Sequence, residues 1–141
     1  MNYITGKVFI DTNILVYLLS DTEPDKRKNI QSLLGQIEGE NPIVWSTQII
    51  QEFYQVMTSK YGKEPQKIKA IIKQFTTFET VINGIDTINN AIDIQVLNNL
   101  SFWDSLVISA AVQSSCSTLL TEDLNHGQNI GGVMIHNPFA E

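Results

Sequence analysis

Four acidic side chains of this sequence stand in or beside strongly apolar segments. Asp11 lies in "FIDTNILVY", Glu52 in "STQIIQEF", Asp104 in "SFWDSLVISAA" and Asp123 in "LLTEDLNHGQ". Carboxylates brought together repel one another, so a cluster of them must be protonated, dispersed or neutralised by a cation. Hard oxygen donors, without a cysteine set or an evident histidine cage, favour Mg²⁺ or Mn²⁺ over zinc. Such an ion can polarise a phosphodiester and lower the pKa of its bound water.

Each of the four acids also has an ordinary structural explanation. Asp11 can cap a following helix, and Asp123 can form a turn in a loop. Glu52 falls at the seam between the buried and solvated faces of its predicted helix, where a side chain can simply extend into solvent. Ser101-x-x-Asp104 matches a capping box, in which Asp104 reaches back to the Ser101 amide. The functional interpretation therefore depends on whether the fold brings the four carboxylates together.

Short apolar runs that alternate with helical patterns predict the elements that must position these acids. We expect strands at residues 7–11, 42–46, 78–82, 117–121 and 133–136. We expect helices at residues 25–38, 47–61, 65–75, 86–99 and 101–115, and a helical pattern directly after Asp11. This alternation implies an α/β fold, a three-layer α/β/α sandwich around a central, mostly parallel five-stranded sheet. Sites in such sheets form beyond the carboxyl ends of the strands, where Asp11 and Asp123 are predicted to lie.

Length and composition limit the class of protein. A chain of 141 residues, 43% hydrophobic and 17% charged, fits one folded domain, which we assign to residues 1–141. Cys116 is the only cysteine, so no internal disulfide can form, and a reducing, cytoplasmic location is expected. The longest unbroken apolar run, residues 14–19, is too short to cross a membrane, and no signal peptide is indicated.

Taken together, the four acidic motifs resemble those of the PIN-domain family, and most closely the VapC-type ribonuclease toxins of prokaryotic toxin–antitoxin pairs. The resemblance covers nearly the whole chain, and the order and spacing of the acids fit. It implies an α/β/α sandwich that acts as a Mg²⁺- or Mn²⁺-dependent endoribonuclease on single-stranded RNA. It also implies inhibition by a cognate antitoxin protein and assembly as a homodimer.

The resemblance also assigns roles to particular residues. The acidic quartet would be Asp11, Glu52, Asp104 and Asp123, with Asn13 and Thr121 as polar supports. Asp11, Asp104 and Asp123 would hold the metal, the first two most directly. Glu52 and Asp123 would complete the metal environment through water molecules and orient the attacking water.

The net charge of −6 argues against nonspecific attraction to nucleic acid, because proteins that neutralise phosphates usually carry an excess of Lys and Arg. The lysines nevertheless concentrate in "KYGKEPQKIKAIIK", where Lys60, Lys63 and Lys67 are candidate RNA contacts. A solvated helix face would show the same pattern.

Four aromatic residues are candidates for stacking on RNA bases, although aromatics at helical spacing more often belong to a core or a subunit interface. They are Tyr54, Tyr61, Phe102 and Trp103.

Two alternatives to a ribonuclease remain open at this point. A haloacid-dehalogenase-like phosphatase would also carry an aspartate after its first strand, but its D-x-D-x-T pattern fails here at Asn13 and Leu15. A catalytically inactive PIN-like binding protein would keep the fold without turnover. The presence of all four acids argues against this second alternative.

Overall fold

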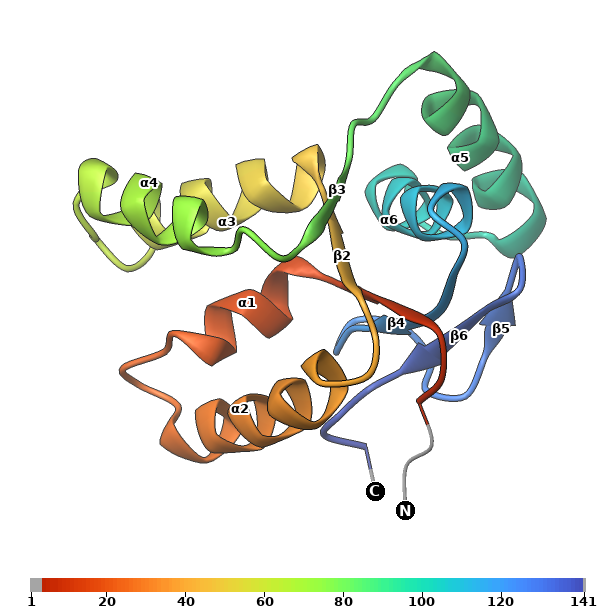
Figure 1. Ribbon diagram of the computed structural model, residues 1–141. Helices are drawn as coiled ribbons and strands as arrows, with labels where there is room; N and C mark the ends of the chain where they lie inside the picture. Colours follow the sequence, from red (N-terminus) through yellow and green to blue (C-terminus); the bar gives the residue numbers. More distant parts are fainter. Residues whose placement is uncertain (1–3, 141) are drawn as a thin grey trace.

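Six strands form one sheet in the order β3-β2-β1-β4-β6-β5 in the computed structural model, which describes residues 4–140 (Figure 1). The strands are β1 (Lys7–Ile10), β2 (Ile43–Ser46), β3 (Glu79–Val81), β4 (Cys116–Leu120), β5 (Asn129–Ile130) and β6 (Val133–His136). All neighbouring strands pair in parallel except β5 and β6, which are antiparallel. The mostly parallel sheet is thus confirmed.

The predicted count of five strands was wrong, because β5 had been missed. It contains two residues, too few to show the alternation that marks a strand. Gly131 and Gly132, at φ +61° and +90°, turn the chain directly into β6. Both values lie in the left-handed region that a tight hairpin turn needs and that glycine adopts without strain. The Gly-Gly pair was the one sequence signal that could have revealed this edge strand.

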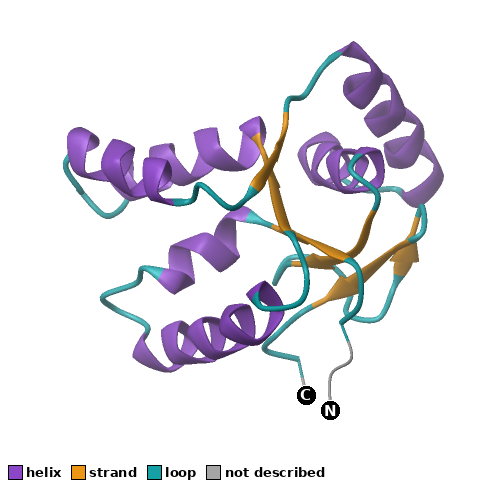
Figure 2. Cartoon of the chain, in the orientation of Figure 1, coloured by secondary structure: helices purple, strands orange, loops and turns teal. Residues whose placement is uncertain are grey.

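The helices are α1 (Thr12–Leu18), α2 (Pro24–Glu38), α3 (Thr47–Ser59), α4 (Pro65–Gln74), α5 (Ile85–Asn98) and α6 (Phe102–Gln113). Figure 1 shows α1 to α4 on one side of the sheet and α5 and α6 on the other, so the three-layer sandwich is confirmed. Figure 2 shows the strands running between the two helical layers. Within residues 4–140, no helix combines the length and hydrophobicity needed to cross a membrane.

Burial explains why α6 lacks the polar face of an ordinary surface helix. Every residue from Ser105 to Ala111 is buried, because α6 packs between the sheet and α5. The Ser109 hydroxyl donates a hydrogen bond of 2.7 Å to the Thr87 carbonyl oxygen of α5, which satisfies a buried polar group. Helix α5 consequently forms the outer layer and exposes several apolar side chains.

The sheet order places the ends of several elements at one edge. From β1 the chain moves outward through β2 to β3, and it returns to the other side of β1 as β4. The point between β1 and β4 is therefore a topological switch point, where α/β proteins form their sites. Helix α3 starts at this edge because it follows β2. Helix α6 also starts there, because a helix that precedes a parallel strand runs antiparallel to it.

Candidate active site

A cavity of about 690 Å³ opens at this edge of the sheet and is lined by all four predicted acids. Asp11 comes from the end of β1, Glu52 from α3, Asp104 from the first turn of α6 and Asp123 from the loop after β4. Four carboxylates that are up to 112 positions apart in sequence thus face one space. The fold brings these predicted site residues together.

Asp11 is the most buried of the four, with 6% of its surface exposed. Its Oδ2 accepts a hydrogen bond of 2.8 Å from the Thr121 hydroxyl, and its Oδ1 accepts one of 2.7 Å from the Thr12 amide. The second bond caps α1, so Asp11 is a helix cap as well as a cavity residue. Thr121 also accepts a hydrogen bond of 3.1 Å from the Asp123 amide, which fits its predicted position as a polar support.

The pKa of Asp11 is raised from 3.8 to about 6, chiefly because burial disfavours the charged carboxylate. The hydrogen bonds from Thr121 and Thr12 oppose this rise, and the nearby charges of Asp123 and Glu52 add to it. The expected repulsion between crowded carboxylates is therefore present at Asp11. A cation placed among these groups would relieve it.

The two residues after Asp11 hold two of the other acids. The Thr12 hydroxyl donates a hydrogen bond of 2.7 Å to Oε1 of Glu52, and Nδ2 of Asn13 donates one of 2.9 Å to Oδ2 of Asp123. Three consecutive residues, "DTN", thus supply one carboxylate and position two more. Asn13 was predicted as a support. Thr12 was not predicted, and its position between Asp11 and Asn13 was the signal that could have identified it.

Asp104 lies in the first turn of α6, and its backbone amide donates a hydrogen bond of 3.0 Å to the Ser101 hydroxyl. This bond is the Ser101 half of the predicted capping box. Within residues 4–140, no hydrogen bond engages the Asp104 carboxylate itself. Capping by Ser101 therefore leaves the carboxylate of Asp104 available to the cavity.

The donor set fits a hydrated Mg²⁺ or Mn²⁺ ion. Among residues 4–140, no three acidic, histidine or cysteine side chains are grouped closely enough to bind one ion together. Mg²⁺ typically keeps several water ligands and is held directly by one or two carboxylates. Carboxylates spread around a common cavity suit such an ion better than they suit a dehydrated one.

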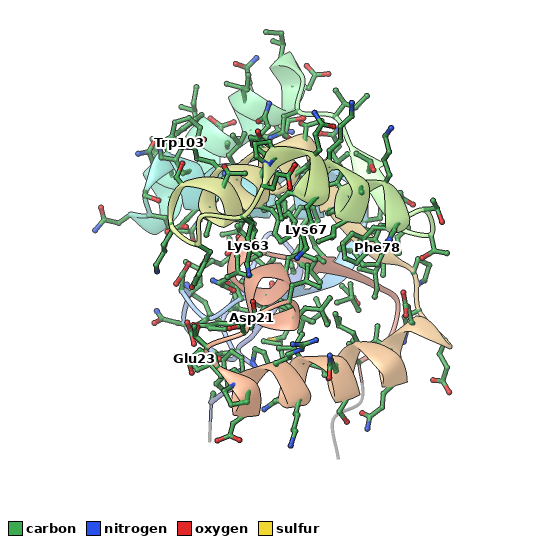
Figure 3. The ribbon with its side chains drawn as sticks, turned by 90° about the vertical axis from the view of Figure 1, so that its left-hand side faces the viewer. Asp21, Glu23, Lys63, Lys67, Phe78 and Trp103 are labelled. Carbon is green, nitrogen blue, oxygen red and sulfur yellow. The ribbon has the colours of Figure 1, made fainter. Side chains whose placement is uncertain are left out.

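The three candidate lysines are placed differently. Lys60, just after α3, is exposed and lines the cavity. Lys63 forms an ion pair of 2.6 Å with Asp21, beside which it lies in Figure 3. Lys67 is exposed on α4 and does not line the cavity. Lys60 is therefore the one of the three that borders the acids.

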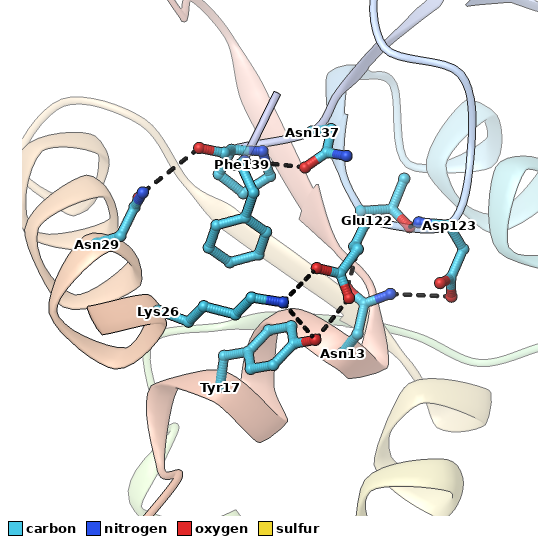
Figure 4. A network of polar contacts seen from close by, with 10 residues as sticks. Asn13, Tyr17, Lys26, Asn29, Glu122, Asp123, Asn137 and Phe139 are labelled. Carbon is cyan, nitrogen blue, oxygen red and sulfur yellow. Dashed lines mark hydrogen bonds and ion pairs between the residues drawn. The ribbon is translucent and has the colours of Figure 1, made fainter. Parts of the chain in front are cut away.

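The loop that carries Asp123 is braced from outside the cavity by Glu122 (Figure 4). Glu122 accepts hydrogen bonds of 2.9 Å from Lys26 and 2.5 Å from the Tyr17 hydroxyl. Burial opposes ionisation of Glu122, but the bonds from Tyr17 and Lys26 outweigh it and lower the pKa. The Glu122 amide donates a bond of 3.4 Å to Oδ1 of Asn13, whose Nδ2 holds Asp123. Glu122 thus points away from the cavity while fixing the loop.

Asn137 and Phe139 complete this set of contacts, which we call the brace and which also includes Asn13, Tyr17, Lys26 and Glu122. The Phe139 ring meets the Tyr17 ring edge-on, with centroids 5.3 Å apart. Nζ of Lys26 lies 4.4 Å from the Tyr17 ring centroid and 4.9 Å from that of Phe139. The Phe139 amide donates a hydrogen bond of 2.9 Å to Asn137 (Figure 4). No pattern in the sequence indicates this network, because its members come from segments that are remote from one another in the chain.

Comparison with known proteins identifies related folds. The sequence model of the PIN domain matches residues 7–125. No curated protein matches the sequence. The chain is similar to the VapBC2 structure from Rickettsia felis bound to a promoter DNA fragment, with a TM-score of 0.71, 18% identity and coverage of 93% of this chain and 98% of that chain.

Two further solved structures are similar. A toxin–antitoxin complex from Klebsiella pneumoniae gives a TM-score of 0.70 at 22% identity, covering 94% of this chain and 98% of that one. The sarcin-ricin loop cleaving toxin VapC20 from Mycobacterium tuberculosis gives a TM-score of 0.67 at 14% identity, covering 79% of this chain and 86% of that one. At these identities, the structural likeness shows a shared fold.

The raised pKa of Asp11 predicts how stability depends on pH without metal. The pKa is about 6 in the folded chain and near 3.8 when unfolded, so the folded chain binds this proton more tightly and is stabilised by it. This contribution to the free energy of unfolding is complete below pH 4 and is lost as pH rises through 6. The loss amounts to about 3 kcal/mol. Asp11→Asn should abolish this part of the pH dependence in urea unfolding between pH 4 and 8 with EDTA. Asp93→Asn, on exposed α5 surface, is the matched control, and equal pH slopes for wild type and Asp11→Asn would contradict the assignment.

The brace predicts a local effect of Lys26→Met, which keeps an apolar stem against Tyr17 and Phe139 but removes the charge facing Glu122. The ion pair is about one-third exposed, so we expect a loss of at most about 1 kcal/mol, or about 4 °C in Tm. Hydrogen exchange at the amides of Glu122 and Asp123 should accelerate more than elsewhere. Lys28→Met on the exposed face of α2 should change neither quantity. Unchanged exchange in the Lys26 variant would argue against the brace.

Proposed function

Because the chain belongs to the PIN-domain family, we propose that it is a Mg²⁺- or Mn²⁺-dependent endoribonuclease that cleaves single-stranded RNA. The observation that carries the proposal is the convergence of Asp11, Glu52, Asp104 and Asp123 on one cavity. Membership in this family removes the haloacid-dehalogenase-like alternative. The inactive PIN-like protein remains as the outcome in which no cleavage occurs.

In this proposal, each acid has a role set by its surroundings. Asp11 and Asp104 would hold the metal directly, with Asp123 contributing to its shell. Thr12 fixes Oε1 of Glu52 and Asn13 fixes Oδ2 of Asp123, so the second oxygen of each carboxylate is left to accept a hydrogen bond from water. Glu52 and Asp123 would use these oxygens to orient the attacking water.

The bound ion would supply positive charge to the phosphodiester and lower the pKa of a coordinated water. This chain's residues would contribute the orientation. Thr121 and the Thr12 amide hold both oxygens of Asp11, which fixes the direction of its remaining lone pairs. The buried position of Asp11 also limits the access of bulk water to its carboxylate.

We further propose that the protein is the toxin of a toxin–antitoxin pair and acts in the cytoplasm. The support is the family together with neighbours of the same fold: VapBC2 from Rickettsia felis, the Klebsiella pneumoniae toxin–antitoxin complex, and VapC20, a toxin that cleaves the sarcin-ricin loop. The expected partner is a cognate antitoxin protein that inhibits the cleavage.

The metal prediction is tested by cleavage of a single-stranded RNA with Mg²⁺ or Mn²⁺ present. Asp11→Asn and Asp104→Asn should each lower the cleavage rate at least about a hundredfold, because each removes a direct metal ligand, without loss of fold by circular dichroism. Asp93→Asn makes the same chemical change on α5 and should retain full activity. Equal cleavage in excess EDTA, or in both site variants, would refute metal-dependent catalysis at these acids.

The position of Lys60 predicts that the three lysines contribute unequally to RNA binding. Lys60→Ala should weaken binding several-fold and reduce the slope of log affinity against log salt by about 0.7, the contribution of one phosphate contact to a single strand. Lys67→Ala, away from the cavity, is the control and should leave the slope unchanged. An equal effect of both substitutions would assign binding to the general charge of the segment.

The homodimer implied by the resemblance also stays a proposal. Helix α5 exposes Ile85, Ile92 and Val96 along one stripe, and Val96 is the most exposed of these three, at 77%. Sedimentation velocity should give twice the chain mass of 15.8 kDa, and Val96→Glu should shift the protein to the monomer because it places a charge in an apolar contact. A wild-type chain that sediments as a monomer at micromolar concentration would contradict the proposal.

A further inference from the structure

Trp103 is an exposed aromatic residue at the edge of the carboxylate cavity. The residue is 62% exposed, lines the cavity and directly precedes Asp104. The chain's other tryptophan, Trp45, is 3% exposed and packs edge-on against Phe75 and Phe78. Tryptophan is highly buried on average in folded proteins. The exposure of Trp103 is therefore a feature to be explained.

Two contacts hold Trp103, one on its backbone and one on its indole ring. Its carbonyl oxygen accepts a hydrogen bond of 3.2 Å from Nε2 of Gln48, which is 5% exposed and lies at the start of α3. The Phe102 ring meets the indole edge-on, with centroids 5.3 Å apart. Trp103 also belongs to the first turn of α6, whose following residues are buried. The indole thus projects from a rigid support into the opening of the cavity.

Gln48 itself faces the same cavity. Its Oε1 is buried and has no hydrogen-bond partner among residues 4–140. A buried amide oxygen without a partner is uncommon and calls for an explanation at a site. Here the Gln48 amide group connects α3, which carries Glu52, to the turn of α6 that carries Trp103 and Asp104. The backbone from which the indole projects is thereby tied to the elements that carry the acids.

We infer that Trp103 is a stacking platform for an unpaired nucleobase of the RNA whose phosphodiester enters the carboxylate cavity. The inference rests on the proposed ribonuclease function and adds a binding subsite to it. Stacking on a flat aromatic face is open to every base and requires that the base be unpaired, so it selects single strands.

Electrostatics favours the same conclusion. The chain has a net charge of −6, and four carboxylates line the cavity, so phosphates are attracted only weakly until a cation is bound. Base stacking is a contact that does not depend on phosphate charge, and it contributes affinity where charge does not. Lys60 and Trp103 line the same cavity, so a nucleotide in it could reach a cation through its phosphate and an indole through its base.

The test is a fluorescence titration of the wild-type chain with a single-stranded RNA 12-mer in EDTA, where no cleavage is expected. We expect the tryptophan emission to change on binding and this change to disappear in Trp103→Phe, which retains only buried Trp45. Trp103→Ala should weaken binding roughly fivefold to a hundredfold, the range for loss of one stacked base, while Trp103→Phe falls between. The same 12-mer paired with its complement should bind weakly and leave the emission unchanged.

Tyr54, a candidate for base stacking by sequence, is an exposed aromatic residue of α3 that does not line the cavity, so the structure does not place it in this subsite. Tyr54→Ala is therefore the matched control. It should leave the affinity for the 12-mer unchanged. Equal affinities of the wild type and Trp103→Ala would overturn the inference, and so would absence of RNA binding by the wild type in EDTA. Loss of self-association or of antitoxin binding in Trp103→Ala, with RNA affinity intact, would instead assign the indole to a protein contact.

The two proposals can fail separately. Metal-dependent RNA cleavage with equal affinities in wild type and Trp103→Ala would leave the ribonuclease standing and remove the stacking site. Absence of cleavage with any metal would remove the ribonuclease itself, whatever the fluorescence shows.

Discussion

The burial of one ionisable carboxylate, that of Asp11, is the constraint on which the site depends. β1 is buried on both faces, and its chain continues directly into α1, so the residue between them has little access to water. A charge placed there needs donors, a counter-ion or a proton. Thr12 and Thr121 supply two donors, and the acidic neighbours increase the need for a cation. The same position that makes the Asp11 carboxylate costly without a counter-ion would make it an effective ligand in the proposed metal site.

The sheet topology turns this local constraint into a site. Because the chain passes from β1 to β2 on one side and reaches β4 on the other, the end of β1 lies between two elements that are remote in sequence. Thr121 and Asp123 reach Asp11 and Asn13 across that junction, while Thr12 reaches Glu52 on α3. Backbone direction thus decides which carboxylates meet, and short side-chain hydrogen bonds orient those of Asp11, Glu52 and Asp123.

The sequence was sufficient for features that arise from local pattern. Alternating strands and helices predicted the sandwich, and the positions of Asp11 and Asp123 after apolar strands predicted the edge at which they lie. Contacts between remote segments were not predictable in this way, since no periodicity connects Glu122 to Lys26, or Thr12 to Glu52. β5 was missed because two residues carry no alternation. The exposure of Trp103 depends on tertiary packing around the start of α6, which no local pattern reveals.

The division between the site and its brace has a physical consequence. The PIN-domain match ends at residue 125, and it therefore includes all four acids but not Asn137 or Phe139, which help to hold the Asp123 loop. The acids converge through the sheet, a rigid element, whereas Asp123 stands on a loop whose position depends on contacts with α2 and the C-terminal residues. A loop fixed only by its own turn would move independently of β1. Glu122 is joined to Asn13 and Tyr17 of α1 and to Lys26 of α2. The loop therefore follows these two helices, and their side chains maintain the separation between Asp123 and Asp11.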